Sequence, residues 1–311
     1  MEHSREAEPS SVQTRGGASP VLLVRSLRPQ QWTKNLFVFA GLLFSGRLID
    51  RTAWPAAVAA FLIFCGLSGA VYLVNDVLDR AADAQHPIKR YRPIASGALA
   101  PGIALTAALV LAAGCVAAAT AINTALTVTA VSYMVLLATY SAALKHYVII
   151  DVLTLSAGFV LRAVAGAVAI GVPISHWLLV CSTLLALFIG LSKRRHELTL
   201  LSDGAAGHRP ILQEYSPYLL DQMISVVTAA TLVAYSVYTI SSETAERLGS
   251  DRLGLTIPFV LYGIFRYLYL VHRRDGGGSP SELLLTDRPL LVCVALWVAA
   301  VVLVLYTPLG G

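Results

Sequence analysis

Charged residues are scarce in this chain, and their scarcity excludes most soluble architectures. Only 13% of its 311 residues are Asp, Glu, Lys or Arg, against about 25% in a typical globular protein, while 56% are apolar. Disorder over the body of the chain is excluded, because disordered segments combine low hydrophobicity with high charge. No heptad or Gly-X-Y repeat is present, which excludes a coiled-coil rod and a collagen helix. The composition indicates an integral membrane protein.

Paired cysteines are also missing. The four cysteines lie singly in apolar runs, without a CxxC pair, at Cys65, Cys115, Cys181 and Cys293. In such positions cysteine behaves as a small hydrophobic residue. The sequence therefore predicts neither a disulfide framework nor a zinc site.

Long apolar segments dominate the chain after residue 20. A membrane-spanning helix needs about 20 mostly apolar residues. We predict an all-α membrane protein, a bundle of about nine transmembrane helices, in which 21–311 form a single domain. Residues 1–20 lack an apolar run and are predicted to be a disordered cytoplasmic tail. The predicted spans are 34–46, 54–75, 99–119, 123–144, 148–170, 176–192, 219–241, 253–271 and 289–307.

Basic residues are concentrated in one set of connecting segments. Of the 23 Lys and Arg residues, 17 fall in the N-terminal segment and in 76–98, 145–147, 193–218 and 272–288. Because cytoplasmic loops carry the excess of Lys and Arg, we expect a multi-pass protein of the cell membrane with these segments and the N-terminus inside and the C-terminus outside. The topology accounts for the net charge of +5, so no nucleic-acid partner is predicted. The longest polar connections are cytoplasmic, and chemistry is expected on that side.

An acidic helix end is the first segment with chemical character. In 75–83 (NDVLDRAAD), a helix at 100° per residue places Asn75, Asp76, Asp79 and Asp83 on one narrow face. Carboxylates this close repel one another unless a cation holds them. Hard oxygen ligands suit Mg²⁺, which is usually shared between carboxylates and substrate phosphates. A solvated acidic helix end is the alternative.

A basic loop follows immediately, at 86–97 (HPIKRYRPIASG). Its prolines and glycine prevent a long helix, and Lys89, Arg90 and Arg92 supply charged donors for phosphate oxygens. By itself the loop could be a topology signal only. Together with the acidic face, it indicates a magnesium-diphosphate site.

These two segments resemble the UbiA superfamily of intramembrane prenyltransferases. Four further segments resemble its decaprenyl-phosphate phosphoribosyltransferase branch. They are 27–35 (LRPQQWTKN), 140–145 (YSAALK) leading to Asp151, 161–166 (LRAVAG) and 193–198 (KRRHEL). The resemblance covers about residues 25–305 in unbroken order.

The resemblance implies a magnesium-dependent phosphoribosyltransferase. Such an enzyme would move a 5-phosphoribosyl group from phosphoribosyl diphosphate to a polyprenyl phosphate, for synthesis of a cell-envelope pentose donor, and could be a homo-oligomer. Asp76, Asp79 and Asp83, with Asn75, would hold the catalytic metal. Donor phosphates would be bound by Lys89, Arg90, Arg92, Lys193 and Arg194, and the other substrate-binding candidates are Lys34, Tyr140, Lys145, Asp151, Arg162 and Glu197.

One departure from the superfamily pattern favours this branch. The usual member carries a second aspartate-rich motif after its sixth span, where this chain has 193–197 (KRRHE). On a helix, Lys193, Arg194 and Glu197 form one cationic face with an internal carboxylate, which could bind phosphate directly. A positive-inside loop with an ion pair four residues apart is the alternative.

A charged residue in the middle of a predicted span is the last candidate. Arg162 needs a partner or a water-filled cavity, because an unpaired charge in lipid is costly. Asp151 lies about 20° away on the same helical face but roughly 16 Å along the axis, so the two cannot touch, although both could line one cavity. A structural arginine bonded to backbone carbonyls is equally compatible with the sequence.

Two other functions are compatible with parts of the sequence. A conventional UbiA-type enzyme would transfer an isoprenyl chain to an aromatic acceptor, but it should carry the second acidic motif. A non-enzymatic membrane transporter or scaffold would account for the spans and for Arg162, but not for acids and bases gathered on one face.

Overall fold

The computed structural model describes residues 19–202, 210–273, 283 and 286–307, and within them all regular structure is helical. Seven of the described segments are long and apolar enough to cross a membrane. They are α3 (Ala53–Leu78), α5 (Pro101–Ile122), α6 (Thr124–Ala142), α7 (Ile150–Ala169), α9 (Pro217–Ile240), η5 (Arg252–Thr256) with α11 (Ile257–Arg273), and α13 (Arg288–Tyr306). The 27-residue α8 (His176–Ser202) packs on α7 and α9. The prediction of an all-α membrane bundle is confirmed.

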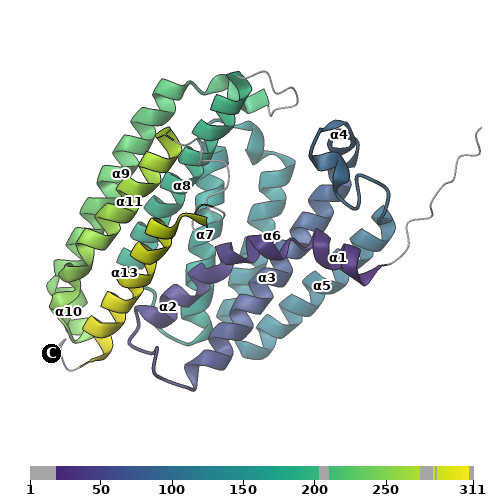
Figure 1. Ribbon diagram of the computed structural model, residues 1–311. Helices are drawn as coiled ribbons and strands as arrows, with labels where there is room; N and C mark the ends of the chain where they lie inside the picture. Colours follow the sequence, from purple (N-terminus) through teal and green to yellow (C-terminus); the bar gives the residue numbers. More distant parts are fainter. Residues whose placement is uncertain (1–18, 203–209, 274–282, 284–285, 308–311) are drawn as a thin grey trace, which may run out of the picture.

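The first predicted span, 34–46, has a different structure from the one expected. α1 (Pro20–Ser26), the 3₁₀ helix η1 (Pro29–Phe39) and the single turn α2 (Ala40–Leu43) run across the bundle rather than along it (Figure 1). Close backbone packing holds this segment, since a Cβ added to Gly166 would lie 1.7 Å from the carbonyl oxygen of Val38. The predicted 34–46 span is therefore not one continuous α-helix, and the count of nine spanning helices is not reproduced.

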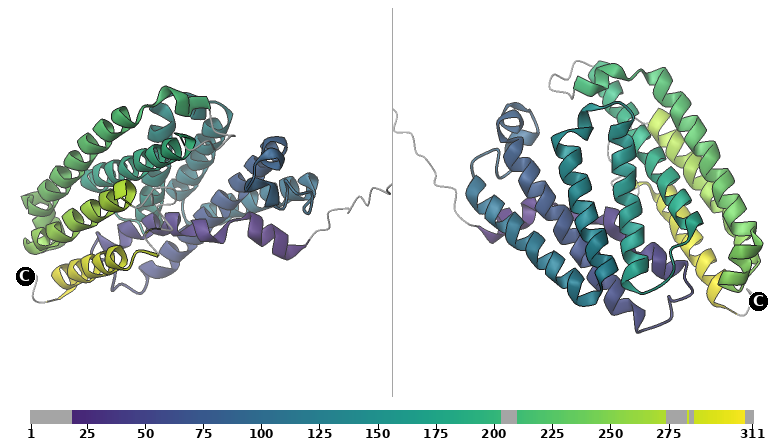
Figure 2. Two further views of the ribbon diagram at one scale, coloured as in Figure 1. Left: turned by 45° about the horizontal axis from the view of Figure 1, so that its top comes forward. Right: turned by 180° about the vertical axis from the view of Figure 1, so that it is seen from behind.

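The two largest hydrophobic clusters of the described residues connect the long helices. The first packs Phe64 and Leu67 of α3 against Tyr133 of α6, and the second packs Leu191 of α8 against Ile224 of α9. Seen from behind, α3 and α5 lie on one side of the bundle, α6 and α7 in the middle, and α9 and α11 on the other side (Figure 2). Fixed helix packing of this kind can hold side chains from distant parts of the sequence in register.

The polar connections gather at one end of the bundle. α4 (Arg80–Gln85), η2 (Lys89–Tyr91), η3 (Leu144–His146) and η4 (Pro210–Glu214) lie there, while α10 (Ser242–Leu248) lies at the opposite end (Figure 1). The basic segments 76–98 and 145–147 are thus on the same side of the protein. The predicted tail falls outside the described residues except for its last two, where α1 begins.

Candidate active site

The end of α3 carries the predicted acidic motif, and two of its four side chains come together. Asp76 and Asp83 are each 3% exposed, although α3 ends at Leu78 and Asp83 belongs to α4. Asp79 stands at the break between the two helices with φ −87° and ψ 6°, and it is exposed. Asn75 is half-buried one turn before Asp79.

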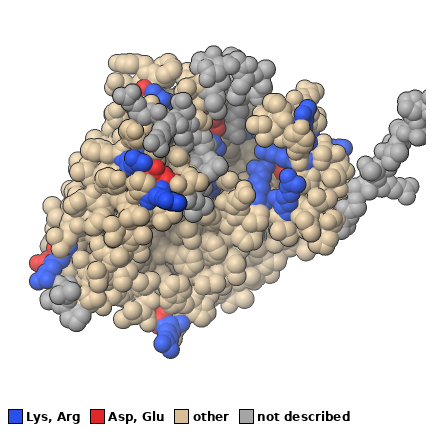
Figure 3. All heavy atoms as spheres, in the orientation of Figure 1, with Lys and Arg blue, Asp and Glu red and all other residues tan. Residues whose placement is uncertain are grey.

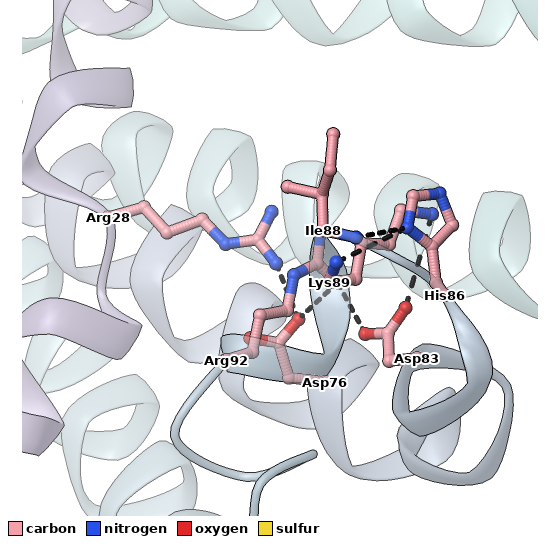
Figure 4. Close-up of polar contacts among 7 residues, drawn as sticks. All are labelled: Arg28, Asp76, Asp83, His86, Ile88, Lys89 and Arg92. Atoms are coloured by element: carbon pink, nitrogen blue, oxygen red, sulfur yellow. Dashed lines mark hydrogen bonds and ion pairs between the residues drawn. The ribbon is translucent and has the colours of Figure 1, made fainter.

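The basic loop folds back onto these two carboxylates. Arg92 bridges them, with Nη1 3.1 Å from Oδ1 of Asp76 and 2.5 Å from Oδ2 of Asp83 (Figure 4). Nζ of Lys89 lies 4.0 Å from Oδ1 of Asp83. Arg28, at the start of η1, donates from Nη2 to Oδ1 of Asp76 at 2.5 Å. We call these five residues the acid-base cluster.

Two other residues of the loop have local roles. Arg90 is exposed and donates to the hydroxyl of its neighbour Tyr91 at 2.7 Å, so it joins neither carboxylate. Nδ1 of His86 accepts from the backbone N–H groups of Ile88 and Lys89 at 3.1 and 3.2 Å. The imidazole therefore shapes the loop that carries Lys89.

The donor set of the acid-base cluster fits magnesium. Asp76 and Asp83 present buried carboxylate oxygens, the ligand type that Mg²⁺ prefers, and guanidinium cations already bind those oxygens. Among the residues that the structure describes, no three His, Cys, Asp or Glu side chains converge as a metal site. Magnesium would thus be shared between this pair and oxygens from elsewhere, such as a substrate diphosphate.

A second group joins α6, α7 and α8. Arg194 is 2% exposed, and its Nε donates to Oδ2 of the fully buried Asp151 at 2.7 Å. Its Nη1 donates to Oε2 of Glu197 at 2.5 Å and its Nη2 to the Tyr140 hydroxyl at 3.4 Å. Lys193 lies 3.8 Å from the other oxygen of Glu197. The structure thus brings together five predicted residues, which we call the Arg194 group. The guanidinium of Arg194 already has hydrogen-bond partners within the protein.

Arg162 of α7 is held by neutral partners. It donates to the side-chain oxygen of Asn35 at 2.7 Å, to the carbonyl of Gly158 at 2.8 Å and to the Tyr133 hydroxyl at 2.6 Å. The guanidinium also stacks 4.8 Å above the Tyr133 ring. Arg162 is 6% exposed, and as predicted it does not touch Asp151. Among the residues that the structure describes, no carboxylate pairs with this buried positive charge.

Lys34 precedes Asn35 on η1 and faces other cations. Burial, followed by the charges of Lys193, Arg162 and Arg28, lowers the pKa of Lys34 from 10.5 to about 7. Within the described part of the chain, no hydrogen bond or ion pair satisfies its ammonium group. An anion bound here would compensate several positive charges at once. Lys145, on η3, is half-buried and belongs to neither group.

The surface around the acid-base cluster reflects this charge distribution. Basic side chains with acidic atoms among them gather where α1 and α4 meet the end of α3, and the face beside them is hollowed (Figure 3). A water-soluble anion can reach this end of the bundle without crossing its apolar part.

Comparison with known proteins agrees with these motifs. The model of the UbiA prenyltransferase family matches residues 35–285. The chain belongs to the UbiA prenyltransferase family. The matched part of this UbiA-family protein contains the whole Arg194 group and every residue of the acid-base cluster except Arg28.

Two similar proteins share one name. The decaprenyl-phosphate phosphoribosyltransferase of Corynebacterium glutamicum is 34% identical over 91% of this chain and 86% of its own length. The protein of that name from Mycolicibacterium smegmatis is 32% identical over 97% and 98%. Among solved structures, a UbiA homolog from Archaeoglobus fulgidus bound to DMAPP and Mg²⁺ is 19% identical, with a TM-score of 0.69 over 90% of this chain and 98% of that one. That likeness confirms the fold.

Two residues of the site, Arg28 and Tyr215, are not among the predicted site residues. Arg28 lies 48 positions from Asp76, and helical periodicity relates only residues within one helix. Tyr215, in the connection between α8 and α9, donates to Oδ1 of Asp151 at 2.9 Å. Arg28 lies within a segment that resembles the family, whereas a tyrosine in a polar connection gives no signal of its own.

Proposed function

We propose that this UbiA-family protein transfers the 5-phosphoribosyl group of phosphoribosyl diphosphate to a polyprenyl phosphate and releases diphosphate. One observation carries the proposal: the cluster that contains Asp76 and Asp83 lies near Lys34 and Arg162, which have no carboxylate partner among the described residues. A substrate that carries both a metal-bound diphosphate and a further phosphate fits these two neighbouring groups, one anion at each. The names of the relatives from Corynebacterium glutamicum and Mycolicibacterium smegmatis support the same reaction.

The acid-base cluster would receive the diphosphate of the donor. Asp76 and Asp83, with Asp79 and Asn75 nearby, would hold magnesium, which when bound neutralises charge on the leaving diphosphate. Arg92, Lys89 and Arg28 would contact phosphate oxygens, since guanidinium and ammonium groups form their strongest hydrogen bonds with such anions. Arg90 is also predicted to bind donor phosphate, but because its guanidinium donates to Tyr91 and to neither carboxylate, we assign it a smaller part in that binding.

The buried cations would bind a phosphate without a metal. Lys34 presents an ammonium group, the buried Arg162 adds positive charge near it, and the partly exposed Lys193, which is paired with Glu197, adds a second ammonium group. Arg194 was expected to bind phosphate, but its bonds to Asp151 and Glu197 suit a supporting role instead. We assign it to holding Glu197, and through Glu197 the ammonium group of Lys193.

The reaction breaks the bond from the anomeric carbon to diphosphate and forms one from that carbon to a lipid phosphate oxygen. Positive charge develops on the ribose ring as diphosphate departs, so fixed charges that stabilise the leaving anion lower the barrier. The lipid phosphate is already an anion, and no side chain has to remove a proton from it. The cations therefore bind and orient two anions.

The proposed setting follows from the charge pattern and the bundle. We place the protein in the cell membrane with the polar end, the N-terminus and the active site in the cytoplasm and the C-terminus outside, 21–311 forming one domain. The lipid product would serve cell-envelope pentose transfer. A homo-oligomer fits this arrangement as well.

The test is turnover by purified full-length protein in detergent. Labelled phosphoribosyl diphosphate is incubated with a polyprenyl phosphate and magnesium, in parallel with an isoprenyl diphosphate and an aromatic acceptor. We expect a phosphoribosylated lipid, with loss of activity in EDTA that magnesium restores. A prenylated aromatic product would show the conventional UbiA reaction instead, and the absence of turnover with either pair would favour the transporter or scaffold.

A further inference from the structure

The start of α7 contains a strained turn. Ile149 has φ +69° and ψ −45°, and the backbone N–H of Ile150 donates to the carbonyl of Val148 at 2.8 Å. This is a γ-turn of the rare form with positive φ. For a β-branched residue that conformation is an outlier that costs free energy, so surrounding contacts must hold it in place.

The hydroxyl of Tyr215 provides such a contact. It accepts a hydrogen bond from the backbone N–H of Ile149 at 2.7 Å, and it donates to Oδ1 of Asp151 at 2.9 Å. Tyr215 is 4% exposed. Burial raises the pKa of its hydroxyl to about 12, so the proton that it donates to Asp151 is present at any working pH. One hydroxyl thus fixes both the turn and the carboxylate two residues later.

The fixed carboxylate leads directly to the Arg194 group. Oδ2 of Asp151 accepts from Arg194, which in turn donates to Oε2 of Glu197. The other oxygen of Glu197 lies 3.8 Å from Nζ of Lys193. Of the cations that lower the pKa of Lys34, Lys193 has the largest effect, although burial contributes more than any of them. Continuous polar contacts therefore run from the turn at Ile149 to the cations assigned to phosphate binding.

We propose that Tyr215 is a positioning residue, whose hydroxyl holds Asp151 and the Ile149 turn so that Arg194 and Glu197 present Lys193 to a substrate phosphate. The proposal rests on the proposed phosphoribosyl transfer and adds a residue that never touches substrate. Removal of the hydroxyl would leave the N–H of Ile149 and one oxygen of Asp151 without this shared partner. The turn and the carboxylate would then relax together.

Tyr215→Phe tests the proposal, with Tyr235→Phe as the matched control. Tyr235 is also buried, and its hydroxyl also makes two hydrogen bonds, to Thr256 at 2.6 Å and from Trp297 at 2.9 Å, but at the far end of α9. We expect Tyr215→Phe to raise KM for one phosphate-bearing substrate about tenfold or more, with a much smaller change in kcat. Tyr235→Phe should lower the melting temperature comparably and leave KM unchanged.

Lys193→Met separates positioning from a general loss of structure. Lys193→Met and Tyr215→Phe should raise KM for the same substrate. The double variant should have a KM for that substrate no higher than that of Lys193→Met alone. Independent, multiplying effects, equal KM changes in both Tyr variants, or an unchanged KM in Tyr215→Phe would each overturn the proposal. If the wild-type protein makes no phosphoribosylated lipid, the proposed function itself has failed.

Discussion

Lys34 should make phosphate binding depend on pH in a way that arginine at the same position does not. With a pKa of about 7, Lys34 loses its proton as the pH rises above neutrality, whereas arginine stays charged. If the bound phosphate requires the charged form, binding takes up a proton. At pH 9 only about 1% of the free protein would carry a charged Lys34, so affinity should fall by up to about tenfold per pH unit above pH 7.

Steady-state kinetics of the wild type and Lys34→Arg measure this effect. KM for each substrate is determined between about pH 6 and pH 9 for both proteins. The wild-type KM divided by the KM of Lys34→Arg is then plotted against pH. The ratio cancels the titration of the substrate phosphates, whose second pKa is near 6 in a phosphomonoester. For the substrate bound by Lys34, the ratio should rise steeply above about pH 7, while for the other substrate it should stay flat. Parallel profiles for both substrates would refute the assignment of Lys34.

Three further outcomes follow from the same contacts. The lowered pKa of the buried Lys34 destabilises the folded state most at and below pH 7, and this destabilisation decreases as the pH rises from 7 towards 10.5. Lys34→Met should therefore have a higher melting temperature than the wild type at neutral pH, while losing activity. A lower melting temperature would contradict the argument from burial. Arg92→Met should lower kcat/KM by about a hundredfold, because Arg92 bridges both carboxylates. Arg90→Met should lower kcat/KM by less than about threefold, because Arg90 bonds only to Tyr91 among these residues. Equal losses in the two variants would show that the bridge is unimportant. Ile149 and Ile150 are similarly exposed, at 43% and 42%. Ile150→Gly should lower the free energy of unfolding by about 1 kcal/mol, whereas Ile149→Gly should not lower it, because glycine adopts the positive φ without strain. Equal losses in thermal melting of the two variants would show that the turn is unstrained.

Hydropathy predicted the long helices because lipid requires an unbroken apolar length, and that requirement is local to each segment. It failed at 34–46, where the backbone of η1 approaches α7 at Gly166 and the segment adopts a 3₁₀ form that hydropathy does not distinguish. Composition alone cannot show that a short apolar run lies across a bundle.

The candidate site was predictable to the extent that its residues share a helix or a motif. The spacing of Asp76 and Asp83 indicated that both face one region, and the following loop does contribute Arg92. Periodicity did not indicate that Asp79 would be exposed at a helix break, or that Arg194 would be buried between Asp151 and Glu197. Those outcomes depend on contacts between helices, as does the link from Tyr215 to Asp151.

The central claim is that one end of the bundle holds a diphosphate that leaves and a second phosphate that stays with the sugar. The most direct measurement uses phosphoribosyl diphosphate labelled with radioactive phosphorus either in the diphosphate or at the 5-position, incubated with the protein, magnesium and a polyprenyl phosphate. We expect the 5-phosphate label to appear in the extracted lipid and the diphosphate label to remain in the aqueous phase. Transfer of the diphosphate label to the lipid, or no label in the lipid from either labelled form of the donor, would contradict the proposed reaction.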